Sequence, residues 1–283
     1  MEHFGLIGHP LGHSVSPIIH KRFFDFSKRS GCDYRLFDIS PENLPAQIGT
    51  LASLRGYNVT IPHKQAIIPY LDQLDSAAER YRAVNVVQNQ NGILSGYNTD
   101  VTGFLKSVEQ LGVSFSGKRI LVLGYGGAGR MMATEAAFQG AAEISIAARR
   151  ASLEKAEKLA VEIRKAVLGC KVTSLPLENV SREYDLIVNS TPSGMYPNIN
   201  ESPLTKKQLI GSKALFDAIY NPSETRLMAD AKGCGLAVAG GMTMLVWQAA
   251  AAHTIWYGAQ FDTKEIEQLI YEMERYVLSH FQQ

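Results

Sequence analysis

Residues 118–150 have the sequence KRILVLGYGGAGRMMATEAAFQGAAEISIAARR, the most informative stretch of the chain. An apolar strand over residues 119–123 leads into the pattern Gly124-x-Gly126-x-x-Gly129, an Ala- and Met-rich helix and a second strand. Gly124 would permit the tight turn, Gly126 would let a pyrophosphate approach the backbone, and Gly129 would let helix and strand pack closely. The N–H groups at the start of the helix would bind the anion. The stretch predicts a dinucleotide-binding βαβ unit; a glycine-rich turn without a ligand is the alternative.

The end of the second predicted strand, residues 143–147, indicates which dinucleotide binds. An NAD site usually has an Asp or Glu there, which bonds to the ribose 2′-hydroxyl. This chain has Ala147-Ala148-Arg149-Arg150 instead. Guanidinium groups suit a 2′-phosphate because they bind it in bidentate fashion. NADP is therefore favoured over NAD, and the alternative for each arginine, chiefly Arg150, is a place in a solvated loop.

Composition limits the class of protein. With 283 residues and 46% hydrophobic content, the chain can bury a full core and form two domains. A net charge of +1, from 28 basic and 27 acidic residues, gives no general electrostatic reason to expect nucleic acid or an anionic membrane as a partner. The longest apolar run, residues 242–252, is too short to span a bilayer, and the amino end lacks the pattern of a secretory signal.

The cysteines indicate a reduced protein without a metal site. Cys32, Cys170 and Cys234 are odd in number, far apart and without closely spaced His or Cys partners. Composition as a whole therefore predicts a soluble, reduced, cytoplasmic protein with no metal site.

Strand and helix patterns alternate before the glycine motif, which is typical of an open βαβ sheet. Asn91-Gly92 is a strong two-residue hairpin signal, so the strands on either side of it should pair antiparallel and make this sheet mixed. The predicted strands cover residues 3–8, 34–39, 57–61, 84–90 and 93–98, and the predicted helices cover 17–30, 42–54 and 62–71.

The alternation resumes after Arg150 and predicts a doubly wound Rossmann domain. A helix is expected over 153–167, with strands at 171–175, 185–189, 214–217 and 236–238. The segment 242–283 carries no strand pattern, and its apolar residues from Ile266 to Phe281 repeat at helical spacing, which predicts closing helices. The fold class is therefore α/β with two domains, an open mixed α/β domain and a Rossmann domain.

Residues 58–64, NVTIPHK, end a predicted strand and open a helix with a proline in its first turn, which places Lys64 at the sheet edge where open α/β sheets bind ligands. A hydride added to a ketone leaves an alkoxide, which needs a proton donor or a positive charge nearby. Lysine supplies both. Asp100, at the end of the hairpin's second strand, could hold the amine in place. A solvated lysine and a helix-capping aspartate are the alternatives.

The turn after the first strand offers two hydroxyl groups next to a helix start, which suits a carboxylate or a polyol. Ser16 precedes Pro17, so an ordinary N-cap is its alternative role, and Ser14 is the stronger candidate for binding. His13 and His63 are interpreted as structural, hydrogen-bonded imidazoles in turns.

Eight segments, taken in order, resemble the shikimate dehydrogenase family over nearly the whole chain. They are residues 12–17 (GHSVSP), 58–64 (NVTIPHK), 83–85 (AVN), 98–100 (NTD), 124–129 (GYGGAG), 189–195 (NSTPSGM), 217–222 (DAIYNP) and 241–248 (GMTMLVWQ).

This resemblance implies an NADP-dependent oxidoreductase that reversibly reduces 3-dehydroshikimate to shikimate in the aromatic amino acid (chorismate) pathway. It implies Lys64 and Asp100 as the catalytic pair. The implied substrate-binding residues are Ser14, Ser16, Asn58, Thr60, Asn85, Thr99, Tyr220 and Gln248. The implied cofactor-binding residues are Gly124, Gly126, Gly127, Ala128, Gly129, Arg149, Arg150, Thr191, Met195 and Gly241. It also implies a discontinuous substrate domain, residues 1–101 with 241–283, and an NADP domain, residues 102–240, in a monomer or homodimer.

The chain departs from the family's pattern at a few positions. Val86 and Val101 stand where the family usually has Thr and Gly, and Ala148 and Arg150 stand where its 2′-phosphate clamp has Asn and Thr. A quinate/shikimate dehydrogenase with broader substrate or cofactor choice is therefore the leading alternative.

Two other kinds of protein share the outline. An NADP-binding regulator without activity would need neither Lys64 nor Asp100. A folate-type methylene dehydrogenase would not need the hydroxyls of the Ser14 turn, or Tyr220 and Gln248, which favour a hydroxy-acid substrate.

Overall fold

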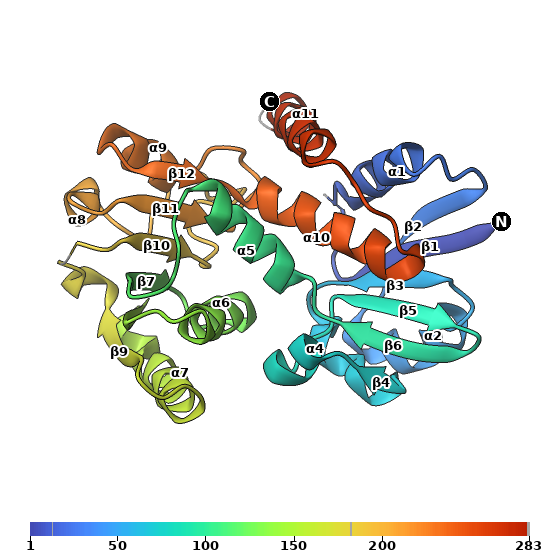
Figure 1. Cartoon of the computed structure of the whole chain (residues 1–283), viewed down its shortest axis with the longest axis horizontal. Coiled ribbons are helices and arrows are strands. Elements are labelled where there is room, and N and C mark those ends of the chain that lie inside the picture. Colours follow the sequence, from blue (N-terminus) through green and yellow to red (C-terminus); the bar gives the residue numbers. More distant parts are fainter. Residues whose placement is uncertain (13, 182, 282–283) are drawn as a thin grey trace. The chain divides into compact units, whose positions relative to one another are not determined.

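A computed structural model of the chain describes residues 1–12, 14–181 and 183–281, so His13 lies outside the described residues. The chain forms two compact units, residues 1–102 with 246–269 and residues 103–245 with 270–283 (Figure 1). Each unit has a six-stranded sheet with helices packed on it. The predicted α/β class with a mixed-sheet domain and a Rossmann domain is confirmed.

The sheet of the first unit has the strand order β2-β1-β3-β5-β6-β4. Only β5 runs antiparallel to its neighbours, so the sheet is mixed as predicted. The hairpin between β5 and β6 turns at Asn91 and Gly92, which have φ angles of 56° and 87°, values that suit a type I′ turn. The strands are β1 (Glu2–Gly8), β2 (Cys32–Asp38), β3 (Gly56–Val59), β4 (Gln73–Leu74), β5 (Val86–Gln90) and β6 (Ile93–Tyr97).

The helices of the first unit are shorter than the sequence patterns predicted. The predicted helix 62–71 is wrong as one piece: it is α3 (His63–Ala66) and a 3₁₀ turn, η2 (Ile68–Tyr70), because Pro69 has no N–H to continue the helical ladder. Helix α1 (Ser16–Phe26) ends early because Lys28 has a left-handed φ of 51°. The remaining helices are η1 (Pro41–Asn43), α2 (Leu44–Leu51) and α4 (Ser76–Tyr81).

The sheet of the second unit is entirely parallel, with the order β12-β11-β10-β7-β8-β9. The order reverses between β7 and β10, the switch point of a doubly wound Rossmann sheet. Helices α6 and α7 pack on β7, β8 and β9, and α9 packs on β11 and β12 (Figure 1). The strands are β7 (Arg119–Leu123), β8 (Glu143–Ala148), β9 (Lys171–Pro176), β10 (Leu186–Asn189), β11 (Ala214–Asp217) and β12 (Ala237–Ala239). The helices are α6 (Gly127–Phe138), η3 (Arg150–Ser152), α7 (Leu153–Ala166), η4 (Leu177–Asn179), α8 (Lys206–Leu209) and α9 (Arg226–Gly233).

Three long helices carry the chain from one unit into the other: α5 (Asp100–Gln110), α10 (Gly241–Tyr257) and α11 (Thr263–Phe281). The carboxyl-terminal half of α10 completes the core of the first unit. Trp256 is fully buried there, and its indole Nε1 donates to Val87 O at 3.0 Å. The predicted closing helices are confirmed. None of the helices in the described ranges is long and apolar enough to cross a membrane.

Candidate active site

The predicted residues of the first unit gather at one edge of its sheet. Strands β1, β3 and β6 run in the same direction, so their carboxyl ends share this edge, and antiparallel β5 begins there. The Ser14 turn follows β1, residues 58–64 cover the end of β3 and the start of α3, and Asn98-Thr99-Asp100 follows β6. Topology therefore brings together segments that are distant in sequence.

Lys64 and Asp100 form a close pair at this edge. The Lys64 ammonium Nζ lies 2.5 Å from Asp100 Oδ2, and the two side chains are 29% and 11% exposed. Asp100 opens α5, and its N–H donates to Asn98 Oδ1 at 3.1 Å. The carboxylate accepts from Lys64 on one oxygen, which leaves the ammonium with further protons to donate.

Asn85 connects this pair to its surroundings. Its amide Nδ2 lies 3.1 Å from Asp100 Oδ1, 3.0 Å from Thr99 Oγ1 and 2.9 Å from Gln248 Oε1, and its Oδ1 accepts from Thr99 N at 2.7 Å. Two amide protons serve three acceptors, so the group is fully engaged. The Thr99 hydroxyl in turn donates to Gln248 O at 3.1 Å. Four predicted site residues from three separate segments of the chain therefore form one hydrogen-bonded group.

Asn58 adjoins this group through the backbone. Its Nδ2 donates to Asn85 O at 3.3 Å, and its Oδ1 accepts from the Tyr34 hydroxyl at 2.7 Å. Burial raises the pKa of Tyr34 well above its ordinary value, so this hydroxyl remains a donor at neutral pH. Tyr34 was not predicted from the sequence, and it fixes the orientation of the Asn58 amide.

Two buried histidines lie behind Tyr34. His20 stacks on the Tyr34 ring with centroids 4.1 Å apart, and its Nδ1 lies 2.9 Å from His253 Nε2. His253 Nδ1 in turn hydrogen-bonds with the Tyr257 hydroxyl. Burial lowers the pKa of His20 to about 3 and that of His253 well below its ordinary value, so both imidazoles are neutral.

In the turn after β1, Ser16 does not have the N-cap role that was its alternative to substrate binding. Helix α1 begins at Ser16, and no side chain caps it, so Ser16 does not act as an N-cap. Instead, the Ser14 hydroxyl accepts a hydrogen bond from Ser16 N at 3.3 Å. Both serines and Thr60 are partly exposed. His63 is fully buried with Nε2 2.6 Å from Ile39 O, which confirms its structural interpretation.

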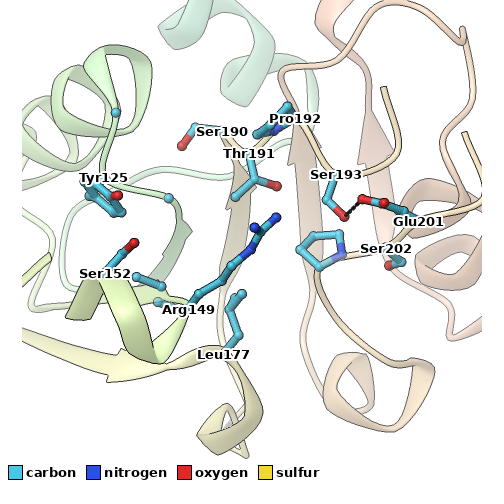
Figure 2. Close-up of a pocket in the computed structure, with 15 residues that line it drawn as sticks. Tyr125, Arg149, Ser152, Leu177, Ser190, Thr191, Pro192, Ser193, Glu201 and Ser202 are labelled. Carbon is cyan, nitrogen blue, oxygen red and sulfur yellow. Dashed lines mark hydrogen bonds between the residues drawn. The ribbon is translucent and has the colours of Figure 1, made fainter. Parts of the chain in front are cut away.

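The second unit holds a cavity of about 690 Å³ at the switch point of its sheet (Figure 2). Residues at the carboxyl ends of β7, β8 and β10 line it, where open α/β sheets bind ligands. Its described lining consists of Gly124, Tyr125, Gly126, Ala147, Ala148, Arg149, Ser152, Leu177, Ser190, Thr191, Pro192, Ser193, Glu201, Ser202 and Pro203.

The glycine motif has the geometry that the sequence predicted. Gly124 has a φ of 101°, which favours glycine, and a Cβ on Gly129 would lie 2.6 Å from Gly124 O and 2.5 Å from Ser190 Oγ. A Cβ on Gly126 or Gly127 would meet nothing within 4 Å, so the approach to the backbone is open. No side chain caps α6, which leaves its first N–H groups available to an anion.

The two arginines after β8 have different surroundings. Arg149 lines the cavity and extends across it with its guanidinium toward Thr191 (Figure 2). Of the described lining residues it alone is basic, and no described residue forms a hydrogen bond or ion pair with its guanidinium. Arg150 instead forms an ion pair with Glu178, and its side chain is 70% exposed. Ser152, which the sequence did not single out, also lines the cavity.

The opposite wall is polar. Ser190, Thr191 and Ser193 follow β10, and the Ser193 hydroxyl donates to Glu201 at 3.4 Å (Figure 2). The sequence motif included Thr191, but Glu201 lay in a loop without a recognisable pattern.

Seven predicted residues of this unit lie outside the described lining of the cavity: Gly127, Ala128, Gly129, Arg150, Met195, Tyr220 and Gly241. Met195 is 46% exposed. Burial raises the pKa of Tyr220 above its ordinary value. Gly241 packs so closely that a Cβ would lie 2.2 Å from Ala218 O.

Comparison with known proteins agrees with this geometry. The family model "Shikimate dehydrogenase substrate binding domain" matches residues 6–87, and "Shikimate / quinate 5-dehydrogenase" matches residues 106–222. A shikimate dehydrogenase (NADP(+)) from Caldanaerobacter subterraneus subsp. tengcongensis is 41% identical over 262 residues, 92% of each chain.

Solved structures are similarly close. Shikimate 5-dehydrogenase from Thermus thermophilus, in complex with NADP(H) and shikimate, is 34% identical with a TM-score of 0.85, over 96% of this chain and 100% of that one. The Listeria monocytogenes enzyme, in complex with shikimate and NAD, is 32% identical with a TM-score of 0.86, over 95% and 96% of the two chains. This chain therefore belongs to the shikimate dehydrogenase family, whose curated relatives here are NADP-dependent oxidoreductases.

Proposed function

We propose that this chain catalyses the reversible reduction of 3-dehydroshikimate to shikimate with NADPH, a step of the aromatic amino acid pathway. The hydrogen-bonded group of Lys64, Asp100 and Asn85 carries the proposal, because it places a proton donor at a ligand-binding sheet edge. NADPH, when bound, supplies the hydride.

Lys64 and Asp100 handle the proton. In reduction, the ammonium stabilises the negative charge that develops on the carbonyl oxygen and then gives it a proton, so that the ketone becomes the hydroxyl group of shikimate. In the reverse direction the neutral amine accepts that proton. Asp100 fixes the position of the amine, and Asn85 fixes the second oxygen of Asp100.

The remaining polar residues of the first unit recognise the substrate. A ring carboxylate with several hydroxyls needs short donors and acceptors. We assign this role to Ser14, Ser16, Asn58, Thr60, Asn85, Thr99 and Gln248, and the family resemblance adds Tyr220 to them. Asn85 and Asn58 are already hydrogen-bonded within the protein, so their main contribution is to orient neighbouring groups.

The departure at Val86 bears on the quinate alternative. Val86 is fully buried beside Phe4 and Trp256, so the hydroxyl missing at this position would lie in the core rather than against a ligand. The departure at Val86 therefore gives no support to a substrate with an additional ring hydroxyl.

The second unit binds NADP. Gly124, Gly126, Gly127, Ala128 and Gly129 accommodate the pyrophosphate at the start of α6, and Arg149 takes the 2′-phosphate. Arg150, drawn toward Glu178, makes a smaller contribution at the rim. Thr191, Met195 and Gly241 belong to the nicotinamide side. In functional terms, residues 1–101 with 241–283 act on substrate and residues 102–240 bind NADP.

Initial rates of NADP⁺ and NAD⁺ reduction with shikimate and with quinate test this assignment. We expect turnover with shikimate and NADP⁺, and rates at least tenfold lower for the other three pairs. Comparable rates with quinate or NAD⁺ would support the broader enzyme. Binding of NADPH without turnover of either acid would support the regulator.

A further inference from the structure

Asp217, the last residue of β11, is a fully buried carboxylate in the second unit. Its Oδ1 accepts from Asn189 Nδ2 at 3.0 Å and from Ile219 N at 3.1 Å, and its Oδ2 accepts from the Thr225 hydroxyl at 2.7 Å. Asn189 ends β10, and Thr225 is the N-cap of α9. One side chain therefore ties together the segments that follow two adjacent strands.

Stability alone does not explain a buried carboxylate at this position. Burial raises the pKa of Asp217 to about 6, although the three hydrogen bonds lower it in part, and no described cation pairs with the carboxylate. A buried charge without a counter-ion destabilises the fold relative to a neutral polar group of the same shape. Hydrogen bonds to an ionised acceptor are, however, shorter and stronger than neutral ones, and they hold their donors more firmly.

The hydrogen bonds of Asp217 extend through Asn189 to the wall of the cavity. Asn189 donates to Asp217 through Nδ2, and through its Oδ1 it accepts from Thr191 N at 3.0 Å and from the Thr191 hydroxyl at 2.7 Å. Thr191 lines the cavity beside Ser190 (Figure 2). Movement of the Asp217 carboxylate would therefore displace Thr191 through a single intervening side chain.

The position of Thr191 indicates which half of the cofactor it meets. A dinucleotide spans the switch point with its pyrophosphate at the glycine turn. Strand β7, which carries the glycine turn, lies between β8 and β10. The adenosine half extends over the end of β8, which the backbone of Arg149 follows, so the nicotinamide half extends over the end of β10, where Thr191 lies.

We infer that Asp217 is a positioning residue for the nicotinamide half of the cofactor, acting through Asn189 on Thr191. The inference rests on the proposed NADP site. It predicts that Asp217 matters for ligands that carry a nicotinamide and is neutral for ligands that carry only the adenosine and its phosphates.

Two ligands distinguish binding of the nicotinamide half from binding of the adenosine half. NADPH carries both halves and is followed by its nicotinamide fluorescence. Adenosine 2′,5′-bisphosphate carries only the adenosine half and is followed by calorimetry. Asp217→Asn keeps the size of the side chain but removes the charge and the acceptor for Thr225. We expect the Kd of NADPH to rise about tenfold, as loss of one charge-assisted hydrogen bond would give, with the Kd of the bisphosphate within twofold of wild type. The fluorescence of bound NADPH should also change.

Ile187→Val is the matched control, because Ile187 is fully buried in β10 and has no polar tie to Thr191. It should leave both Kd values within twofold. Thr225→Ala is the variant to use should Asp217→Asn fail to fold. It removes one of the three donors to Asp217 together with the side-chain cap of α9, where Thr225 accepts from Met228 N. An increase of about threefold for NADPH alone is expected.

Three results would overturn the inference. They are unchanged NADPH binding in Asp217→Asn, or in Thr225→Ala where only that variant folds; equal weakening of both probes; and the same NADPH defect in Ile187→Val. Failure of the wild-type chain to bind either probe would instead contradict the proposed NADP site itself, and the inference with it.

Discussion

Replacement of Arg149 by glutamine should remove most of the preference for NADP over NAD that we propose for this chain. Arg149 is the single basic residue among the described lining of the cavity, and no described side chain competes for its guanidinium. Its interaction with a 2′-phosphate therefore displaces only water. Glutamine keeps most of the length of the side chain and its hydrogen-bonding capacity while removing the charge.

The size of the effect follows from this geometry. A hydrogen bond between charged groups contributes about 1.5–3 kcal/mol, which corresponds to a factor of about 10–150 in kcat/KM. We expect kcat/KM for NADP⁺ to fall within this range. NAD⁺ has no 2′-phosphate, so its kcat/KM should change by less than about threefold.

Initial rates at saturating shikimate with either cofactor measure both values. Arg150→Gln is the matched control, since Arg150 pairs with Glu178 outside the described lining of the cavity. Its effect on NADP⁺ should stay below about threefold, because exposed ion pairs rearrange at little cost. Equal losses for NADP⁺ and NAD⁺ in Arg149→Gln, or a larger loss in Arg150→Gln, would refute the reasoning.

Three further predictions concern catalysis and stability. Lys64→Ala should lower kcat by about 10²–10⁴-fold while the far-UV circular dichroism stays unchanged, because general acid catalysis is lost; a kcat within threefold of wild type would remove Lys64 from the chemistry. Gly129→Ala should lower the free energy of unfolding by about 1–3 kcal/mol, since its Cβ would meet the backbone at Gly124 O, whereas Gly127→Ala has open space and should not; urea unfolding compares the two. The free energy of unfolding should also fall as the pH drops below about 6.5, by about 1.4 kcal/mol per pH unit for each of His20 and His253. Burial lowers the pKa of His20 to about 3 and that of His253 well below its ordinary value, so the unfolded chain binds more protons than the folded one. His20→Gln should reduce this slope between pH 6 and 4, and an unchanged slope would contradict it.

The sequence predicted the Rossmann unit well because its signals are local. An apolar strand, a glycine turn with one left-handed residue and a helix depend on neighbouring residues. The predicted helix is present as α6, and β7 and β8 lie within about one residue of their predicted limits. The hairpin at Asn91-Gly92 was predicted for the same reason.

Other elements escaped prediction for physical reasons. Strand β4 (Gln73–Leu74) has two residues, too few for any periodicity, and it forms because β6 offers a free edge. The pattern over 62–71 has helical spacing, yet Pro69 breaks it. Apolar periodicity indicates which face of a helix is buried, but it does not show that one residue of the helix lacks a backbone N–H.

For the candidate site, too, the sequence predicted residues but not the contacts between them. The motifs named Lys64, Asp100, Asn85 and Gln248 as site residues, but their hydrogen bonds join residues up to 163 positions apart. The sequence alone could not give Tyr34, Ser152 or Glu201 a place near a site, because nothing in their neighbouring residues marks them.

By itself the sequence determined the two α/β domains, the glycine turn and the residue types at the strand ends, because short-range backbone preferences and burial periodicity are written into neighbouring residues. Only the tertiary structure decided which atoms meet. It directed Arg149 into the cavity and Arg150 toward Glu178, and it buried Asp217 behind Thr191. The physical reason is that strand order and the packing of strand ends set these contacts, and neither is encoded in any one segment.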